Sequence, residues 1–165
     1  MKRGIVFWIW GVSLAYLIYQ AATGYSALPE RVASHFAMDG TPNGWMSRTI
    51  CYAIFIGVAL VTNIWPLLGR WMVTAAPGFL NLPNKEYWLQ TPERTTRLAD
   101  VTENLLAGMM ALTNLLLTFA FQVIFQYNTT QQLPVIWPTW TVAAAMTVFG
   151  IWYPLSALKI PKNSH

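Results

Sequence analysis

The sequence predicts an all-α integral membrane protein with four transmembrane helices and a structured extracytoplasmic loop between helices 1 and 2. Of its 165 residues, 55% are hydrophobic and only 10% are charged, whereas about 25% of an average soluble domain is charged. The apolar residues form four long uncharged blocks. Each block holds a window of about 18 to 20 residues, enough to cross a hydrocarbon core roughly 30 Å thick.

The four blocks predict the spans and the loops between them. The spans are expected at about residues 4–22, 49–68, 101–125 and 135–158, in one domain of residues 1–165. Two connections are long enough to carry a site, at residues 26–48 and 70–100. The first 27 residues also have the basic start and apolar centre of a signal peptide. Cleavage after Ala27 would put bulky Tyr25 where a small residue belongs, so we expect an uncleaved first span.

The basic residues predict the orientation. With four spans, both termini and the loop at residues 70–100 share one side, which carries eight of the ten Lys and Arg residues. The other side carries Arg31 and Arg48. Because cytoplasmic loops are enriched in Lys and Arg, we expect both termini in the cytoplasm and residues 26–48 on the opposite side of the membrane. The net charge of +4 therefore reports topology and not nucleic-acid binding.

Turn-forming residues dominate the second half of the outer loop. Residues 39–40 (Asp-Gly) and 43–44 (Asn-Gly) each pair a residue that tolerates positive φ with one that adopts it freely. Pro42 restricts the residue before it to extended conformations. The first half, Pro29 to Phe36, is expected to be a short extended segment. Since Cys51 is the only cysteine, turns must hold this loop without an intramolecular disulfide.

The outer loop also holds the candidate ligand-binding or loop-shaping residues. They are Pro29, His35, Asp39, Gly40, Pro42, Gly44, Trp45 and Arg48. We expect His35 to hydrogen-bond within the loop, and a pH-sensing role is the alternative because histidine changes charge near neutral pH. Glu30, His35 and Asp39 could meet at a metal ion, but structural zinc sites usually have four protein ligands, often including Cys. We therefore predict no metal, no cofactor and no catalytic residue.

The inner loop contains a helix start. In Thr91-Pro92-Glu93, Thr is a favoured N-cap, Pro a favoured first residue, and Glu lies near the positive end of the helix dipole. We expect a helix that begins near Pro92 in the cytoplasm and runs into the third span.

A polar stripe marks the third span. Asn114, Thr118, Gln122 and Gln126 fall four residues apart, on one helix face. Because polar side chains in lipid face the interior of a bundle, the stripe predicts either hydrogen bonds between helices or the wall of a small polar cavity. Asn63 in the second span is likewise expected to bond a neighbouring helix.

The fourth span has a stripe of small residues. Ala143, Thr147, Gly150 and Pro154 recur at helical spacing, which favours close helix packing in lipid. The stripe is compatible with a homo-oligomer. Trp137 lies near the expected outer interface, where amphipathic rings are enriched.

The outer loop resembles a known family. Its sequence is Leu28-Pro-Glu-Arg-Val-Ala-Ser-His-Phe-Ala-Met-Asp-Gly-Thr-Pro-Asn-Gly-Trp-Met-Ser-Arg48. This is similar to the Leu-Pro…Pro-X-His-aromatic…Gly-X-Pro-(Asp/Asn)-Gly…Ser-Lys signature of the bacterial membrane domain of unknown function 1648. Ala33 stands where the family often has Pro, and Arg48 where it often has Lys. The same domain begins the SdpI-like immunity proteins, which protect a bacillus from its own secreted toxic peptide and sequester a cytoplasmic repressor.

The resemblance implies a non-enzymatic protein of the SdpI-like kind. Its outer loop would sense or bind an extracytoplasmic ligand such as a peptide, and its inner loop would contact a cytoplasmic protein. The alternative is a small transporter or a transporter accessory subunit, which the polar stripe favours. A membrane enzyme is the third hypothesis. It finds little support, because the chain has no glycine-rich phosphate loop, Cys-X-X-Cys pair or His-Glu-X-X-His motif.

Overall fold

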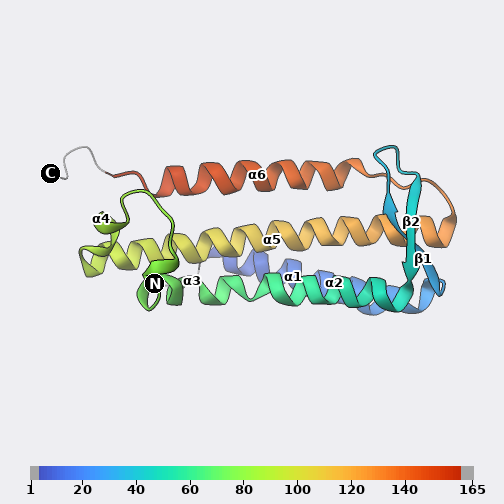
Figure 1. Cartoon of the computed structure of the whole chain (residues 1–165), viewed down its shortest axis with the longest axis horizontal. Coiled ribbons are helices and arrows are strands. Elements are labelled where there is room, and N and C mark those ends of the chain that lie inside the picture. The colour runs from blue at the N-terminus through green and yellow to red at the C-terminus, as the bar shows by residue number, and fades with distance from the viewer. Residues whose placement is uncertain (1–3, 161–165) are drawn as a thin grey trace.

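Long helices run side by side in the computed structural model, which describes residues 4–160 (Figure 1). The elements are α1 (Ile5–Gly24), η1 (Tyr25–Ala27), β1 (Arg31–Phe36), β2 (Pro42–Ser47), α2 (Arg48–Asn63), α3 (Trp65–Thr74), η2 (Pro77–Phe79), α4 (Lys85–Leu89), α5 (Pro92–Thr130) and α6 (Trp137–Ala157). α5 is the central helix, and α1, α3 and α6 each pack along it. The strands lie at one end of the bundle, the cap end; α4 lies at the other, the loop end.

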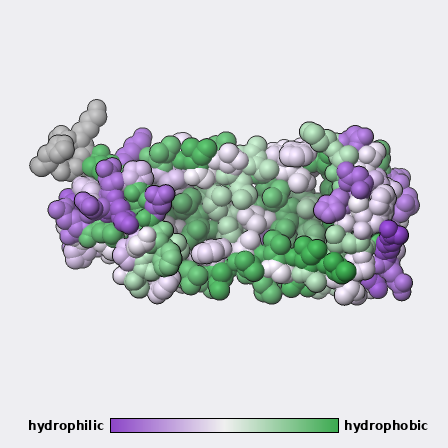
Figure 2. Space-filling view, viewed as in Figure 1, coloured by the Kyte–Doolittle hydropathy of each residue, from purple (hydrophilic) through white to green (hydrophobic). Residues whose placement is uncertain are grey.

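Within residues 4–160, three helical segments are long and apolar enough to cross a membrane. They are Ile5–Ala27, Arg48–Thr74 and Pro92–Thr130. The surface agrees, because hydrophobic residues cover the middle of the molecule and hydrophilic residues gather at both ends (Figure 2). α6 has 21 residues and no charge. Its Trp, Tyr, Thr and Pro residues lower its mean hydropathy, so the fourth span stays a prediction.

We expected an all-α fold. The fold is mostly helical, but the cap end also holds an antiparallel hairpin. β1 is the extended segment that its sequence predicts, but β2 covers residues 42–47, where we expected turns. The chain reverses within residues 37–41 alone. There the Ala37 amide donates to the Thr41 carbonyl oxygen over 2.8 Å, and the Gly40 amide donates to the Ala37 carbonyl oxygen over 2.9 Å.

The Asn-Gly pair at residues 43–44 therefore lies in a strand. The pairing register shifts between Ala33 and His35, and His35 stands opposite Gly44. A Cβ atom on Gly44 would lie 3.0 Å from the His35 ring. Glycine is thus used here for the close approach of a side chain, and not for a turn.

The second apolar segment is longer than expected and is broken once. The helix resumes after Ile64 and continues to Thr74, beyond the predicted end at residue 68. Pro66 has no amide hydrogen, so it cannot continue the hydrogen-bond ladder of α2. Arg70, which we placed in the inner loop, lies on α3 and forms ion pairs with Asp100 and Glu103 of α5. The two acidic partners allow this charge within the helix.

The loop end is folded, with a small core of its own. Trp88 of α4 is buried against Val73, Leu98 and Ala99. α5 begins at Pro92, as predicted, and the Thr91 hydroxyl caps it by accepting a hydrogen bond from the Arg94 amide over 3.3 Å. Its 39 residues give a helix about 58 Å long at 1.5 Å per residue. One helix therefore reaches from the loop end to the cap end.

Candidate functional site

The side chain of one asparagine near the end of α5 forms hydrogen bonds to the hairpin. The Ala33 amide donates to Asn128 Oδ1, and Asn128 Nδ2 donates to the Ala33 carbonyl oxygen, each over 2.9 Å. The Asn128 side chain thus takes the place of a neighbouring strand for β1. Val32 is fully buried beside Phe121 and Ile124 of α5. Residues 28–47, here called the cap, are therefore held on the helix by hydrogen bonds and by apolar packing.

Arg48 joins the cap to the end of the first helix. Its Nη1 atom donates to the carbonyl oxygens of Leu28 and Tyr25, over 2.6 and 3.3 Å. Its guanidinium lies 4.5 Å from the centroid of the Tyr25 ring, a favourable cation–π geometry. The Arg48 amide also donates to the Glu30 carbonyl oxygen over 2.8 Å. These contacts give Arg48 a loop-shaping role.

Asp39 shapes the turn between the strands. The hydroxyl and the amide of Thr41 donate to Asp39 Oδ1 over 2.6 and 2.9 Å, and these bonds lower the pKa of the carboxyl. Because the pKa is lower in the folded than in the unfolded chain, this stabilisation is present above the unfolded value. It is lost as the pH falls through the folded value.

Gly40 allows the turn to close. Its φ is +84°, and a Cβ atom there would lie 3.2 Å from the carbonyl oxygen of Pro134, in the α5–α6 connection. We expect Gly40→Ala to destabilise the cap by about 1–2 kcal/mol, because an L side chain in this region clashes with its own backbone. Hydrogen exchange of the β1 amides measures the effect.

Gly78→Ala is the matched control for the turn. This glycine has no positive φ, and a Cβ atom there would have no neighbour within 4 Å. Equal exchange rates in the two variants would contradict the role given to Gly40.

The remaining candidate loop residues stay near the surface. His35 is exposed and its ring lies against Gly44. Pro29 is exposed, and Pro42, the first residue of β2, is half-buried. Trp45 is 51% exposed on the outer strand. Within residues 4–160, no group of three or more His, Cys, Asp or Glu side chains could hold a metal ion.

A cavity of about 440 Å³ lies beneath the cap. Its walls come from the cap, α2, α5 and α6, and include Phe36, Met38, Phe55, Ala120 and Trp140. Two hydroxyl groups also line it, those of Ser34 and Thr139, and the Thr139 hydroxyl is buried without a hydrogen-bond partner. Among the residues that the structure describes, no charged one lines the cavity. Its shape and chemistry suit an apolar group that carries an uncharged polar group.

The polar stripe divides into bonded and packed members. Asn114 is fully buried, and its side chain pairs reciprocally with Asn63 over 2.8 and 2.9 Å. Asn114 also donates to Ser13, and Trp10 Nε1 donates to Asn63 Oδ1 over 2.7 Å. These four residues, here called the polar cluster, join α1, α2 and α5.

The other stripe residues lie nearer the cap. Gln122 accepts a hydrogen bond from Gln20 of α1 over 3.2 Å, Thr118 is buried, and Gln126 is half-buried. The side chains of Asn114 and Gln122 thus bond neighbouring helices. Of the two alternatives for the stripe, this arrangement favours hydrogen bonds between helices over the wall of a polar cavity.

Sequence reasoning missed two residues of the cap site, Asn128 and Thr139. Asn128 lies off the four-residue spacing of the stripe, since it follows Phe121 and Ile124 on the face that meets the cap. A signal was present, because an amide at the end of a long apolar helix needs a partner. Thr139 had no such signal, since its importance comes from the cavity that it lines.

Comparison with known proteins identifies one segment of the chain. Residues 11–62 match the family described as Domain of unknown function (DUF1648). Neither a curated protein nor a solved structure matches the chain. The matched segment covers most of α1, the cap and nearly all of α2. Residues 11–62 of this membrane protein are therefore similar to DUF1648, the family that the sequence of the outer loop resembles.

Proposed function

We propose that the protein is a non-enzymatic receptor of a bacterial inner membrane, SdpI-like in kind, whose cap binds an extracytoplasmic peptide. The cavity beneath the cap is the observation that carries this proposal. It offers apolar and aromatic walls together with the hydroxyl groups of Ser34 and Thr139. A peptide segment matches both, because an apolar side chain fills such a space and a neutral backbone amide bonds to hydroxyl groups.

The cap also suits a ligand that arrives from outside. Met38 is 81% exposed at the tip of the hairpin, beside the cavity. Methionine is flexible and polarisable, and such residues are common at surfaces that accept varied apolar partners. Trp140 of α6, which also lines the cavity, is 57% exposed. A hydrophobic peptide would thus meet two large exposed side chains that line the cavity.

The orientation is part of the proposal. The start of α1 and the end of α6 both lie at the loop end (Figure 1). We propose that α6 crosses the membrane with the other three segments. Most of the described basic side chains also belong to that end, among them Lys85, Arg94 and Arg97. The positive-inside rule then places the loop end in the cytoplasm and the cap outside. A cytoplasmic partner protein would meet α4 and the connections beside it.

The transporter hypothesis takes second place. It relied on a polar stripe that could line a path. The Asn63–Asn114 pair and the Gln20–Gln122 bond instead use those side chains to join helices. This arrangement supports a structural role for the stripe.

Peptide challenge of the source bacterium tests the proposal. Deleting the gene should increase sensitivity to membrane-active peptides, and the wild-type gene should restore resistance. Ala120→Phe should fail to restore it, because the larger side chain fills the cavity. Thr139→Val should restore it only in part, because the hydroxyl is lost while the size is kept.

Thr141→Val is the matched control, since this hydroxyl bonds its own helix at the Trp137 carbonyl oxygen over 3.1 Å. Membrane levels of each variant are compared by immunoblot. Unchanged sensitivity of the deletion strain to every peptide would overturn the immunity role. Full resistance with Ala120→Phe would overturn the cavity as its site.

A further inference from the structure

A second cavity, of about 500 Å³, lies where the cap meets the first turn of α2. We call it the charged pocket, and its lining residues are Glu30, Arg31, Met46, Ser47, Arg48 and Thr49. It shares no lining residue with the cavity beneath the cap. Its volume falls within the range of about 300–1,000 Å³ that is usual for small-ligand sites. Two guanidinium groups, one carboxylate and two hydroxyl groups thus meet in a space large enough for a small charged group.

Arg48 leaves one edge of its guanidinium group without a partner. Its Nη1 atom donates to the carbonyl oxygens of Leu28 and Tyr25. Among the described residues, nothing accepts a hydrogen bond from Nη2, and Nε is buried without an acceptor. Nε and Nη2 form the pair of parallel donors with which arginine binds two oxygens of a phosphate or carboxylate. A buried charged donor without an acceptor is costly, so an anion at this edge would stabilise the pocket.

Arg31 brings a second cation to the charged pocket. It stands opposite Ser47 in the hairpin, so the two side chains start on the same face of the strand pair. Arg31 is exposed and forms no ion pair within residues 4–160. The Ser47 hydroxyl caps α2 by accepting from the Ile50 amide over 3.3 Å, and the positive end of the helix dipole therefore lies here as well. An anion in the pocket would meet two cations and this helix end.

Glu30 gives the charged pocket a negative side. Its carboxylate is exposed, and it pairs with neither arginine of the pocket. A simple anion would leave this carboxylate without a partner. A ligand that carries an ammonium group beside its phosphate instead complements all three charged residues.

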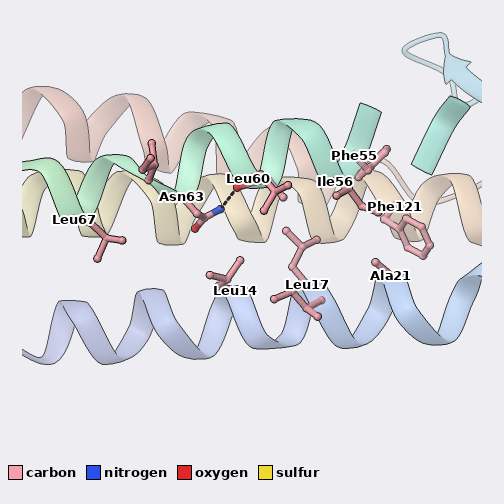
Figure 3. A pocket seen from close by; sticks show the side chains of 12 residues that line it. Leu14, Leu17, Ala21, Phe55, Ile56, Leu60, Asn63, Leu67 and Phe121 are labelled. Carbon is pink, nitrogen blue, oxygen red and sulfur yellow. Dashed lines mark hydrogen bonds between the residues drawn. The ribbon is translucent and has the colours of Figure 1, made fainter. Parts of the chain in front are cut away.

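The charged pocket lies at the boundary between the apolar helices and the cap. The apolar segment Ile5–Ala27 ends shortly before Glu30, and the segment Arg48–Thr74 begins in the pocket itself. Farther from the cap, α1 and α2 face each other with apolar side chains, among them Leu14, Leu17 and Leu60 (Figure 3). Lipid headgroups occupy the band just outside the hydrocarbon core of a bilayer. The position of the pocket therefore favours the headgroup of a lipid over a soluble phosphate.

We propose that the charged pocket binds a phospholipid headgroup that joins one phosphate to one primary ammonium group, as in phosphatidylethanolamine. The phosphate binds Arg31 and the free edge of Arg48, and the ammonium group donates hydrogen bonds to Glu30. One lipid thus connects β1 to the start of α2 and holds the cap at the membrane surface. The proposal does not rest on peptide binding, because the two cavities are separate.

Native mass spectrometry of the purified full-length protein tests the proposal. The probes, each added after delipidation, are dioleoyl phosphatidylethanolamine, dioleoyl phosphatidylglycerol, dioleoylglycerol and inorganic phosphate. We expect the wild-type protein to retain one phosphatidylethanolamine and no dioleoylglycerol, which has the same acyl chains without the headgroup. Arg31→Gln should weaken phosphatidylethanolamine binding about tenfold, because a hydrogen bond between charged groups is lost.

Glu30→Gln separates recognition of the headgroup from support of the fold. Without the carboxylate, phosphatidylethanolamine should bind about tenfold more weakly, because its ammonium group loses a charged partner. Phosphatidylglycerol, which has a phosphate and no ammonium group, should bind more tightly because a repulsive charge is removed. A damaged cap would weaken the binding of both lipids, so opposite changes identify a direct contact.

Lys159→Gln is the charge-matched control. It also removes one exposed cation, but it lies beyond α6 at the loop end, and we expect the wild-type affinity for phosphatidylethanolamine. Equal affinity of the Arg31→Gln and Lys159→Gln variants would overturn the proposal, and so would an unchanged preference between the two phospholipids in Glu30→Gln. Binding of inorganic phosphate without retention of either phospholipid would overturn a lipid as the source of the phosphate.

Discussion

Replacing either asparagine of the central pair should destabilise the bundle more than any other single polar change in the membrane-spanning region. Asn114→Leu removes two hydrogen bonds from Asn63, which then keeps an amide buried in an apolar surrounding. We expect the free energy of unfolding to fall by about 1–2 kcal/mol. Asn63→Leu should cost a similar amount, because Trp10 and Asn114 lose their shared acceptor. Reversible unfolding in mixed micelles with increasing SDS measures both.

The double variant separates pairing from packing. When both amides become leucine, no amide of the pair is left without its partner, so the loss should be smaller than the sum of the single losses by at least about 0.5 kcal/mol. Thr141→Val controls for the loss of a polar group on an exposed helix face. Strictly additive losses would contradict the coupling of the two asparagines.

Asn128→Leu should release the cap while leaving the helices assembled. The substitution removes both hydrogen bonds to Ala33, and it leaves a buried backbone amide and carbonyl unpaired. We expect the local stability of the cap to fall by about 1–3 kcal/mol. Amide exchange in β1 should then become about 5- to 150-fold faster, since each 1.4 kcal/mol is a factor of ten in the opening equilibrium. Hydrogen exchange followed by mass spectrometry reads this directly.

The neighbouring Thr129→Val variant is the control for this site. The Thr129 hydroxyl bonds its own helix at the Phe125 carbonyl oxygen over 2.8 Å, and the residue is exposed. Amides at the centre of α5 should exchange at the wild-type rate in both variants. Faster exchange throughout α5 after Asn128→Leu would show that the cap is not an independent unit.

Helices were more predictable from the sequence than the cap was. Long uncharged runs and the Thr91-Pro92-Glu93 start depend on local chemistry, and α5 begins where that chemistry indicates. The extension of the second segment past residue 68 depends on partners distant in sequence. Arg70 lies on α3 beside Asp100 and Glu103, about thirty residues later. Because a charged residue normally ends an apolar span, the sequence alone places Arg70 in a loop.

The candidate site likewise combines features that depend on local sequence with features that depend on residues distant in sequence. The turn at Asp39 and Gly40 is local, and residue type indicates it. The strand at residues 42–47 is not local, because its Asn-Gly pair is drawn into pairing with β1. The site also includes Asn128 and Thr139, roughly a hundred residues from the hairpin. Their roles follow from which helices surround the cap, and the chain does not encode this in any short pattern.

The length of α5 has a mechanical consequence. A straight helix of about 58 Å is a stiff lever, and a tilt of only about 5° around one end moves the other end by about 5 Å. The cap is fastened to one end of this lever through Asn128, and the small core around Trp88 packs on the other. A slight change in how the cap is seated would thus be amplified across the membrane.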